Sequence, residues 1–409
     1  MFRPRILTKT LQRAIKTFPA IVVTGPRQSG KTTLLRTLFG ATHEFVSLED
    51  PDTRIRAKED PVGFLDAHQP PVLFDEIQYV PELLSFIKTR IDEHRIPGQW
   101  LFTGSQAFGL MQGVSESLAG RAAILTLFPF SYAERVGQAE SAHDTAHWIS
   151  ALSSLPKQSH GNIPLAEWIL RGGYPEIATN PHVDRQLWCG SYIATYLERD
   201  IRNLTNIGDL SQFERFVRLC ATRTGTILNI VDLARDIGVS APTVKRWISV
   251  LEAGGQVYLL YPYYRNIGKR LIKSPKIYFN DTALASYLLG IHHAETLLQN
   301  PHFGNLFETM VVSDLLKRFL HFGELPALYY FRTRDGLEID ALLETGGKLH
   351  LVEIKSAATI LPKHAASLVR MRKELDGLTG TRAIISASKE SYLVSEGVRN
   401  YSWVHALTL

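Results

Sequence analysis

One short segment constrains the fold of this chain of 409 residues more than any other, the run Gly25-Pro26-Arg27-Gln28-Ser29-Gly30-Lys31-Thr32. It follows the apolar run Ala20–Val23 and begins a stretch of helical character, Lys31–Phe39. Glycine at its first and sixth positions lets the backbone turn closely around a bound group. The loop amides and the start of the helix then present N–H donors and a positive dipole end to an anion. The pattern therefore predicts a phosphate cradle between a buried strand and a helix.

The side chains of this loop indicate which phosphate compound it holds. Lys31 is placed to reach β- and γ-phosphates, and Thr32 to ligate Mg²⁺. We therefore expect ATP and Mg²⁺ as cofactors. The predicted nucleotide-binding residues are Gly25, Pro26, Arg27, Gln28, Ser29, Gly30, Lys31, Thr32 and Thr33.

The first 136 residues alternate short apolar runs with amphipathic stretches, which is typical of an α/β domain. The runs are almost wholly apolar, as in strands that are buried on both faces of a parallel sheet. We predict five such strands, at Ala20–Val23, Glu44–Leu48, Val72–Phe74, Trp100–Thr103 and Ala123–Leu127.

Two acids end the third of these strands, Asp75 and Glu76. Asp75 is placed to help hold Mg²⁺, and Glu76 to act as the general base that orients an attacking water. Two solvated acids at a strand end are the alternative, which a phosphate cradle at this distance disfavours.

Two more side chains are candidates for the same site. Ser105 follows the fourth strand and would set a hydroxyl near the γ-phosphate, unless this segment is a plain strand and turn. Arg121 would stabilise charge on the transferring phosphate, in its own subunit or from a neighbouring one, unless it is a solvated surface arginine. The predicted catalytic residues are thus Lys31, Glu76, Ser105 and Arg121, with Thr32 and Asp75 at the metal.

Together these residues resemble the AAA+ class of P-loop ATPases. They look most like a prokaryotic branch that carries the loop described above, then Asp75-Glu76-Ile77-Gln78, then Thr103-Gly104-Ser105-Gln106. The resemblance implies a parallel-sheet ATPase domain.

Capping residues indicate a second module further along the chain. Asn229 is placed to cap a helix Ile230–Ile237, and Gly238 to end it. Ser240 is placed to cap a helix Ala241–Ala253, whose apolar side chains recur at i, i+3, i+4 and i+7. This is the layout of a helix-turn-helix with a recognition helix in second place.

Basic residues gather on the outer face of that second helix and after it. Between Lys245 and Lys276 there are seven basic residues and one acid, Glu252. A winged helix that binds DNA phosphates explains this imbalance, and an inter-domain packing module is the alternative. The candidate DNA-binding residues are Thr243, Lys245, Arg246, Arg265, Lys269, Arg270 and Lys273.

From about residue 300 the pattern predicts a helix, three strands, a helix and a strand. Asp340 lies in one apolar strand, and Glu353 and Lys355 share one face of the next. A Gly346-Gly347 turn joins the two strands, which would bring Asp340 beside Glu353. Two carboxylates with a lysine suit metal-assisted phosphodiester hydrolysis, and Glu308 could add a ligand.

These residues resemble the Asp…Glu-x-Lys motif of the restriction-endonuclease-like fold, PD-(D/E)xK. The order of the predicted elements agrees with that fold. A solvated sheet face is the alternative, although charges in such apolar strands are costly unless they are used. Whether the domain cleaves DNA stays open.

Over nearly its full length the chain resembles one prokaryotic family, an AAA+ ATPase followed by a winged helix and an endonuclease-like domain. The resemblance includes Arg171-Gly-Gly-Tyr-Pro-Glu176 and Tyr196-Leu-Glu-Arg-Asp200, whose chemistry alone gives them no role. We predict an α/β multidomain protein with an ATPase domain at 1–160, a helical region at 161–227, a winged helix-turn-helix at 228–280 and an endonuclease-like domain at 281–409. We interpret the polar segment 137–164 as a surface insertion or linker.

Composition excludes several other classes of protein. Only Cys189 and Cys220 are present, and no apolar run could span a bilayer. The start of the chain, Met1–Arg5, is basic, but no apolar segment of signal-peptide type follows it. We therefore expect a cytoplasmic protein without a membrane partner. A net charge of +5 permits DNA as a partner without requiring it. Motifs of zinc enzymes and serine hydrolases are missing.

The sequence thus predicts a Mg²⁺-dependent ATPase that acts on or with DNA. A nucleotide-switched DNA- or protein-binding module with little turnover remains an alternative, and so does an ATP-regulated, Mg²⁺-dependent DNA nuclease. Glu76 favours the ATPase over the switch, because a switch needs no carboxylate to polarise water. A homo-oligomer, in which Arg121 serves a neighbour's site, stays open.

Overall fold

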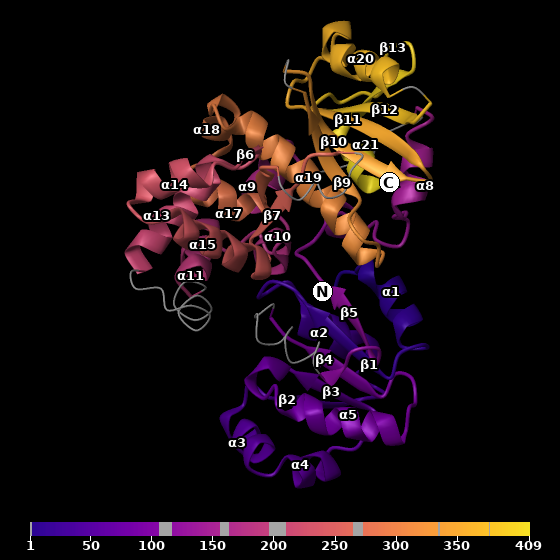
Figure 1. Ribbon diagram of the computed structural model, residues 1–409, viewed down its shortest axis with the longest axis vertical. Helices are drawn as coiled ribbons and strands as arrows, with labels where there is room; N and C mark the ends of the chain where they lie inside the picture. The colour runs from indigo at the N-terminus through magenta and orange to yellow at the C-terminus, as the bar shows by residue number, and fades with distance from the viewer. Residues whose placement is uncertain are drawn as a thin grey trace.

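The structure is a computed structural model that describes residues 2–105, 117–155, 163–195, 210–264, 273–333, 336–375 and 377–409. Three lobes follow one another (Figure 1): an N-terminal α/β lobe in indigo and purple, a mostly helical middle lobe in pink to orange, and a C-terminal α/β lobe in orange to yellow. Within the described residues, no helix is long and apolar enough to cross a membrane.

The N-terminal lobe is built on a parallel sheet of five strands in the order β2-β3-β4-β1-β5. Each predicted strand is confirmed with its ends within one residue. The strands are β1 (Ala20–Thr24), β2 (Glu44–Ser47), β3 (Val72–Asp75), β4 (Trp100–Thr103) and β5 (Ala122–Thr126).

Helices cover both faces of this sheet, which is why its central strands are apolar throughout. On one face α1 (Leu7–Ala14) and α2 (Lys31–Phe39) pack against Ile21, Val23 and Leu101. On the other face Val22, Phe74 and Phe102 pack against three helices, α3 (Pro51–Glu59), α4 (Pro61–Ala67) and α5 (Leu83–Glu93).

The strand order determines what meets at the carboxyl edge of the sheet. Strand β4 lies between β1 and β3, and all three run in the same direction. The segments that follow these strands therefore converge: the glycine-rich loop after β1, Glu76 after β3 and Ser105 after β4. This edge is where parallel α/β sheets bind their ligands.

The middle lobe combines helices with an antiparallel sheet in the order β6-β8-β7. Its elements are α9 (Leu165–Arg171), α10 (Pro175–Thr179), α11 (Arg185–Thr195), α13 (Leu210–Thr222), β6 (Thr226–Ile227), α14 (Ile230–Ile237), α15 (Ala241–Ala253), β7 (Val257–Leu260), β8 (Lys276–Phe279), α17 (Thr282–Leu288) and α18 (Ala294–Gln299).

The two helices that capping residues predicted in this lobe are confirmed. Asn229 accepts hydrogen bonds from the first-turn amides of α14, and Gly238 ends that helix in the left-handed conformation. Ser240 caps α15 by accepting from the amide of Thr243. The apolar face of α15 is buried as expected, at Val244, Trp247, Ile248 and Leu251.

The C-terminal lobe has a mixed sheet in the order β13-β14-β12-β11-β10-β9. The predicted order of helix, three strands, helix and strand is confirmed, and a final hairpin and helix follow it. The elements are α19 (Phe303–His321), β9 (Leu328–Arg332), β10 (Glu338–Thr345), β11 (Lys348–Lys355), α20 (Ala366–Glu374), β12 (Thr379–Ser386), β13 (Tyr392–Ser395), β14 (Val398–Ser402) and α21 (Trp403–Thr408).

The interpretation of residues 137–164 as a surface insertion is wrong for the part that the structure describes. Residues 145–151 form α8 (Thr145–Ala151), which lies beside the C-terminal lobe (Figure 1). Trp148 is fully buried, and its indole nitrogen donates to the Ala406 carbonyl at 2.7 Å. The amide of His143 also donates to the carbonyl of Leu409. Residues near the end of the predicted 1–160 domain therefore pack against the C-terminal lobe.

The boundary expected at residue 281 also falls inside a packed unit. Helix α17 packs against α9, α11 and α13, and α18 packs against α9. Both helices therefore extend the middle lobe, and α19 is the element that leads into the C-terminal sheet. One continuous apolar core runs through the middle lobe, α19 and one face of that sheet.

A buried ion pair lies where the N-terminal lobe meets α19. The Arg5 Nε lies 3.1 Å from the Glu134 Oε1, in α7 (Tyr132–Arg135), and both side chains are almost completely buried. Glu134 also accepts from the amides of Ile6 and Ser131. Burial would raise the pKa of Glu134, but the charge of Arg5 and the nearby His321 of α19 hold it well below its usual range.

We expect Glu134→Gln to destabilise the protein by about 3–5 kcal/mol, because it leaves the Arg5 guanidinium buried without a countercharge. Urea unfolding followed by circular dichroism measures the loss. Glu214→Gln breaks the exposed Arg218–Glu214 pair instead and should change stability by about 0.5 kcal/mol or less. Equal effects of the two substitutions would show that the buried pair is not stabilising the junction.

Candidate functional site

The glycine-rich loop wraps tightly at the end of β1. Gly25 has a φ of 138°, and a Cβ there would lie 2.1 Å from the carbonyl oxygen of Leu127. Gly30 has a φ of 95° and starts α2. A side chain at Gly25 would therefore push the loop away from β5, so glycine is required for the path of the backbone.

Lys31 and Thr32 point from the start of α2 toward the loop and toward β3. The Lys31 Nζ donates to the carbonyls of Gly25 at 3.1 Å and Pro26 at 2.9 Å, so the ammonium lies within the loop. The Thr32 hydroxyl donates to the Asp75 Oδ1 at 2.6 Å. The predicted lysine, threonine and acid therefore come together.

Hydrogen bonds from β4 fix the two acids at the end of β3. The Thr103 hydroxyl donates to the Asp75 Oδ1 at 2.6 Å and accepts from the amide of Glu76 at 2.9 Å. Burial raises the pKa of Asp75, an effect that the two hydroxyl donors oppose. Glu76 has a φ of 57°, so the chain turns sharply directly after Asp75.

Gln78 connects Glu76 to Ser105. Its amide nitrogen donates to the Glu76 carboxylate and to the Ser105 hydroxyl, the latter at 3.1 Å. The structure thus places Ser105, Glu76 and Asp75 in one cluster beside the loop. Sequence reasoning gave no role to Gln78 or Thr103, although Gln78 follows Glu76 by two residues and Thr103 ends the neighbouring strand.

A hydroxyl and a carboxylate at the mouth of a phosphate-binding loop form a suitable donor set for Mg²⁺. Thr32 and Asp75 provide these groups within hydrogen-bonding distance of each other. The Lys31 ammonium lies within the loop, and oxygens of a triphosphate bound there would complete the coordination.

Arg121 lies at the opposite edge of the sheet. Its carbonyl accepts from the amide of Ala20, where β1 begins, whereas the loop follows the end of β1. Its guanidinium pairs with Asp92, with Nε 2.6 Å from Oδ1. The alternative in which Arg121 serves the site of its own subunit is therefore wrong. Its role in a neighbouring site stays a prediction.

The Arg171–Glu176 segment, which sequence reasoning left without a role, packs behind the loop. A Cβ on Gly173 would lie 2.3 Å from the Phe130 carbonyl, and one on Gly172 would lie 2.3 Å from Asp281. A Cβ on Gly30 would lie 3.8 Å from the Cγ of Pro175. These glycines allow the middle lobe to approach the nucleotide site closely. Residues 196–200 lie outside the described residues.

The candidate nuclease residues also come together. The Lys355 Nζ lies 2.7 Å from the Glu353 Oε2 and 3.2 Å from the Asp340 Oδ2. The Glu308 Oε1 instead accepts from Lys276 at 3.1 Å and from the Tyr278 hydroxyl at 2.6 Å. Lys276 and Tyr278, both in β8, were not predicted for this site.

These groups do not fit a divalent metal ion in this arrangement. Within the described ranges, no three His, Cys, Asp or Glu side chains are arranged to hold one. Burial and the neighbouring Asp340 raise the pKa of Glu353 to about 8. Burial opposes ionisation of Asp340 too, but Lys355 and Lys276 keep its pKa below the usual range.

The candidate DNA-binding residues are placed only in part. Lys245 and Arg246 are exposed on α15, and Lys273 is exposed before β8. Thr243 is half-buried and shares a hydrogen bond with Ser240 at the helix cap. The predictions for Arg265, Lys269 and Arg270 lie outside the described residues.

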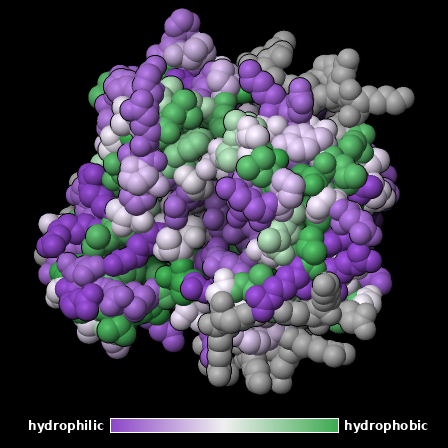
Figure 2. Space-filling view, turned by 90° about the horizontal axis from the view of Figure 1, so that it is seen from above, coloured by the Kyte–Doolittle hydropathy of each residue, from purple (hydrophilic) through white to green (hydrophobic). Residues whose placement is uncertain are grey.

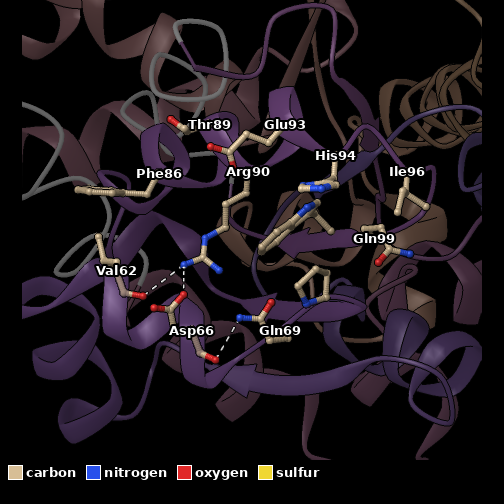
Figure 3. Close-up of a pocket in the computed structure, with 12 residues that line it drawn as sticks. Val62, Asp66, Gln69, Phe86, Thr89, Arg90, Glu93, His94, Ile96 and Gln99 are labelled. Carbon is tan, nitrogen blue, oxygen red and sulfur yellow. Dashed lines mark hydrogen bonds and ion pairs between the residues drawn. The ribbon is translucent and has the colours of Figure 1, made fainter.

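A separate pocket of about 540 Å³ lies between α4, α5 and the start of β4 (Figure 3). Arg90 crosses it and donates to the Asp66 carboxylate and the Val62 carbonyl. Trp100, the first residue of β4, lines it, so it opens at the edge of the sheet away from the loop. The pocket is therefore not part of the nucleotide site.

Comparison with known families divides the chain into three parts. Residues 17–136 match the model of an AAA domain, residues 163–295 match a domain of unknown function, DUF8612, and residues 303–405 match another, DUF4143. The match to DUF8612 includes α17, in agreement with its packing in the middle lobe, and the match to DUF4143 begins at the first residue of α19.

Among solved structures, the chain is similar to a Walker-type ATPase of Pyrococcus abyssi, with 14% identity and a TM-score of 0.44 over 71% of this chain and 99% of that one. It is also similar to the RuvB Holliday junction branch migration motor of Thermotoga maritima, with 18% identity and a TM-score of 0.29 over 62% and 88% of the two chains. Both likenesses are weak, and the family assignment rests on the sequence matches.

Two mycobacterial relatives match most of the chain. The uncharacterised proteins Rv2008c of Mycobacterium tuberculosis and Mb2031c of Mycobacterium bovis are each 31% identical over 351 residues, which are 85% of this chain and 73% of theirs. The chain therefore belongs to the family of these two proteins, and its residues 17–136 form an AAA-type P-loop ATPase domain.

Proposed function

We propose that the chain is a Mg²⁺-dependent ATP hydrolase whose cycle acts on or with DNA. The observation that carries the hydrolase part is the connected set of Thr32, Asp75, Glu76, Gln78 and Ser105 beside the phosphate loop. Binding alone would be served by the loop amides, Lys31 and Thr32.

Glu76 favours hydrolysis over a switch with little turnover. Its carboxylate has a different donor from the metal-side acid, since Gln78 donates to Glu76 whereas Thr32 and Thr103 donate to Asp75. A carboxylate in that place can accept a proton from a water that attacks the γ-phosphate. Gln78 holds this carboxylate beside Ser105, so both groups face one region.

Thr32 and Asp75 would hold Mg²⁺ together with the triphosphate. The ion would neutralise charge that develops on the phosphate oxygens. Lys31 adds a positive charge from within the loop, and the start of α2 adds its dipole.

Exposed basic residues on α15 support the DNA part of the proposal. Within the part of the chain that the structure describes, Lys245 and Arg246 are exposed while the opposite face of the helix is buried. The order α14, α15, β7, β8 has the form of a helix-turn-helix followed by a hairpin. A helix presented in this way can enter a major groove, with its lysine and arginine beside phosphates.

Arg121 would contribute only in an assembly of several copies. It lies on the far edge of the sheet from its own loop, paired with Asp92. A neighbouring copy that placed its loop against this edge would bring the guanidinium to a γ-phosphate. This role is part of the proposal and depends on an oligomer.

Lys31→Ala and Glu76→Gln should separate nucleotide binding from turnover. We expect Lys31→Ala to weaken binding of a fluorescent ATP analogue, because a charge that faces the phosphates is lost. Glu76→Gln should bind the analogue normally but release phosphate about 100-fold more slowly or worse, since it removes the general base. Glu59→Gln, an exposed acid on α3, is the matched control. Undiminished phosphate release by Glu76→Gln would remove Glu76 from the mechanism.

The double substitution Lys245→Glu with Arg246→Glu tests the DNA part. Each lost phosphate contact should reduce the slope of log affinity against log salt by about 0.9, so the double variant should bind duplex DNA more weakly and with a shallower salt dependence. Fluorescence anisotropy at several salt concentrations measures both. Arg235→Glu changes an exposed arginine on α14 as control. If the double variant and the control bind alike, α15 is not the DNA-binding face.

A further inference from the structure

Backbone strain in the phosphate loop is concentrated around Ser29. Gln28 has a φ of 58° and Gly30 has a φ of 95°, so the residues on either side of Ser29 both lie in the left-handed region. For a residue other than glycine this conformation is unfavourable, and it persists only where the surrounding structure holds it. The loop therefore needs contacts that hold Ser29 in place.

Arg5 supplies such a contact from the segment before α1. Its side chain is almost completely buried, and its Nη1 donates to the Ser29 carbonyl at 2.8 Å. The same nitrogen would lie 3.5 Å from a Cβ on Gly30. The guanidinium is therefore adjacent to both residues of the Ser29–Gly30 peptide.

The direction of this hydrogen bond is fixed by the other partners of Arg5. Its Nη2 donates to the Phe128 carbonyl, its Nε lies 3.1 Å from the Glu134 Oε1, and its Cζ lies 4.7 Å from the centre of the Phe130 ring. A guanidinium is a rigid planar fork, so fixing Nε and Nη2 also fixes where Nη1 points. The contact with Ser29 is thus determined by residues outside the loop.

A hydrogen bond to one side of a peptide also fixes its other side. The Ser29–Gly30 peptide is trans, and in a trans peptide the C=O and N–H bonds point in opposite directions. Because the Ser29 oxygen points toward Arg5, the Gly30 N–H points away from it. Amides of such a loop bind the α- and β-phosphates. Rotating this peptide by half a turn would direct a carbonyl oxygen, with its partial negative charge, toward the phosphates instead.

We propose that Arg5 is a positioning residue of the nucleotide site. It orients the Ser29–Gly30 peptide so that the Gly30 amide donates to a phosphate oxygen, and it does so without touching the nucleotide. The inference rests on the proposed nucleotide site and extends it to a residue outside the loop motif. It does not depend on whether the bound ATP is hydrolysed.

Equilibrium titration of the full chain with fluorescent analogues of ATP and ADP, in the presence of Mg²⁺, tests the inference. Arg5→Lys keeps a buried positive charge beside Glu134 but lacks the planar fork that reaches Ser29 and Phe128 together. We expect this variant to bind both analogues at least about tenfold more weakly than wild type, as for the loss of one hydrogen bond to a charged group. In ATP hydrolysis KM should rise while kcat changes little, because Glu76 is unaltered.

Further variants separate this effect from a general loss of stability. Glu134→Gln removes the countercharge but keeps an oxygen that can accept from Arg5, so it should lower the melting temperature and leave both affinities close to those of wild type. The double variant Arg5→Met with Glu134→Gln has neither charge of the buried pair and should bind both analogues as weakly as Arg5→Lys. Arg13→Gln changes an exposed arginine of α1 that donates to the Phe322 carbonyl, and it should behave as wild type in both measurements.

Two outcomes would overturn the inference. One is an unchanged affinity of Arg5→Lys and of the double variant for both analogues. The other is an affinity that falls in proportion to the melting temperature in every variant, Glu134→Gln included, since Arg5 would then act on stability alone. The proposed function fails by a different result, because a wild type that binds both analogues but releases no phosphate is not a hydrolase, while the affinities still test Arg5. If wild type binds neither analogue, the nucleotide site and the inference fail together.

Discussion

The buried ion pair between Arg5 and Glu134 connects the phosphate loop to the rest of the chain. Besides pairing with Glu134, the Arg5 guanidinium donates to the carbonyl of Ser29 in the loop at 2.8 Å and to that of Phe128 after β5. It therefore holds the loop from behind, with its charge close to Gly30. In a nearly dry environment such an interaction is far stronger than on a surface, and far more costly to break on one side.

Helix α19 links this junction to the buried charges around Lys276 and Glu308. Its C-terminal half contacts the segment after β5, where Lys317 donates to the Phe130 carbonyl and Asp314 accepts from the Tyr132 amide. Its N-terminal half carries Glu308 to Lys276. A helix of 19 residues is about 28 Å long, so one rigid element contacts both charged regions. The buried face of α15 belongs to the same apolar core as α19. On the described part of the face seen from above, hydrophilic and hydrophobic residues are intermixed (Figure 2).

Local sequence patterns predicted the elements well, because each depends on neighbouring residues. The five apolar strands, the caps at Asn229 and Ser240, and the Gly346-Gly347 turn are decided within a few positions of the chain. The convergence of Thr32, Asp75 and Ser105 was also predictable, since parallel strands share a carboxyl edge. Contacts between segments that are far apart in the sequence could not be predicted. Lys276 was counted among basic residues for DNA, and Arg5 as part of a basic N-terminus, because nothing nearby reveals their acidic partners. Trp148 was hidden in a polar segment whose composition suggested solvent exposure.

The central claim is that the loop and its acids convert bound ATP rather than merely hold it. A single-turnover experiment tests this most directly. Purified protein is mixed in excess with ATP labelled at the γ-phosphate, supplied with Mg²⁺, and the bound nucleotide is recovered by acid quench over time. Wild type should convert the bound ATP to ADP and phosphate, and the Glu76→Gln variant should do so much more slowly. Recovery of intact ATP from wild type, still bound after long incubation with and without DNA, would contradict hydrolysis and identify the chain as a nucleotide switch.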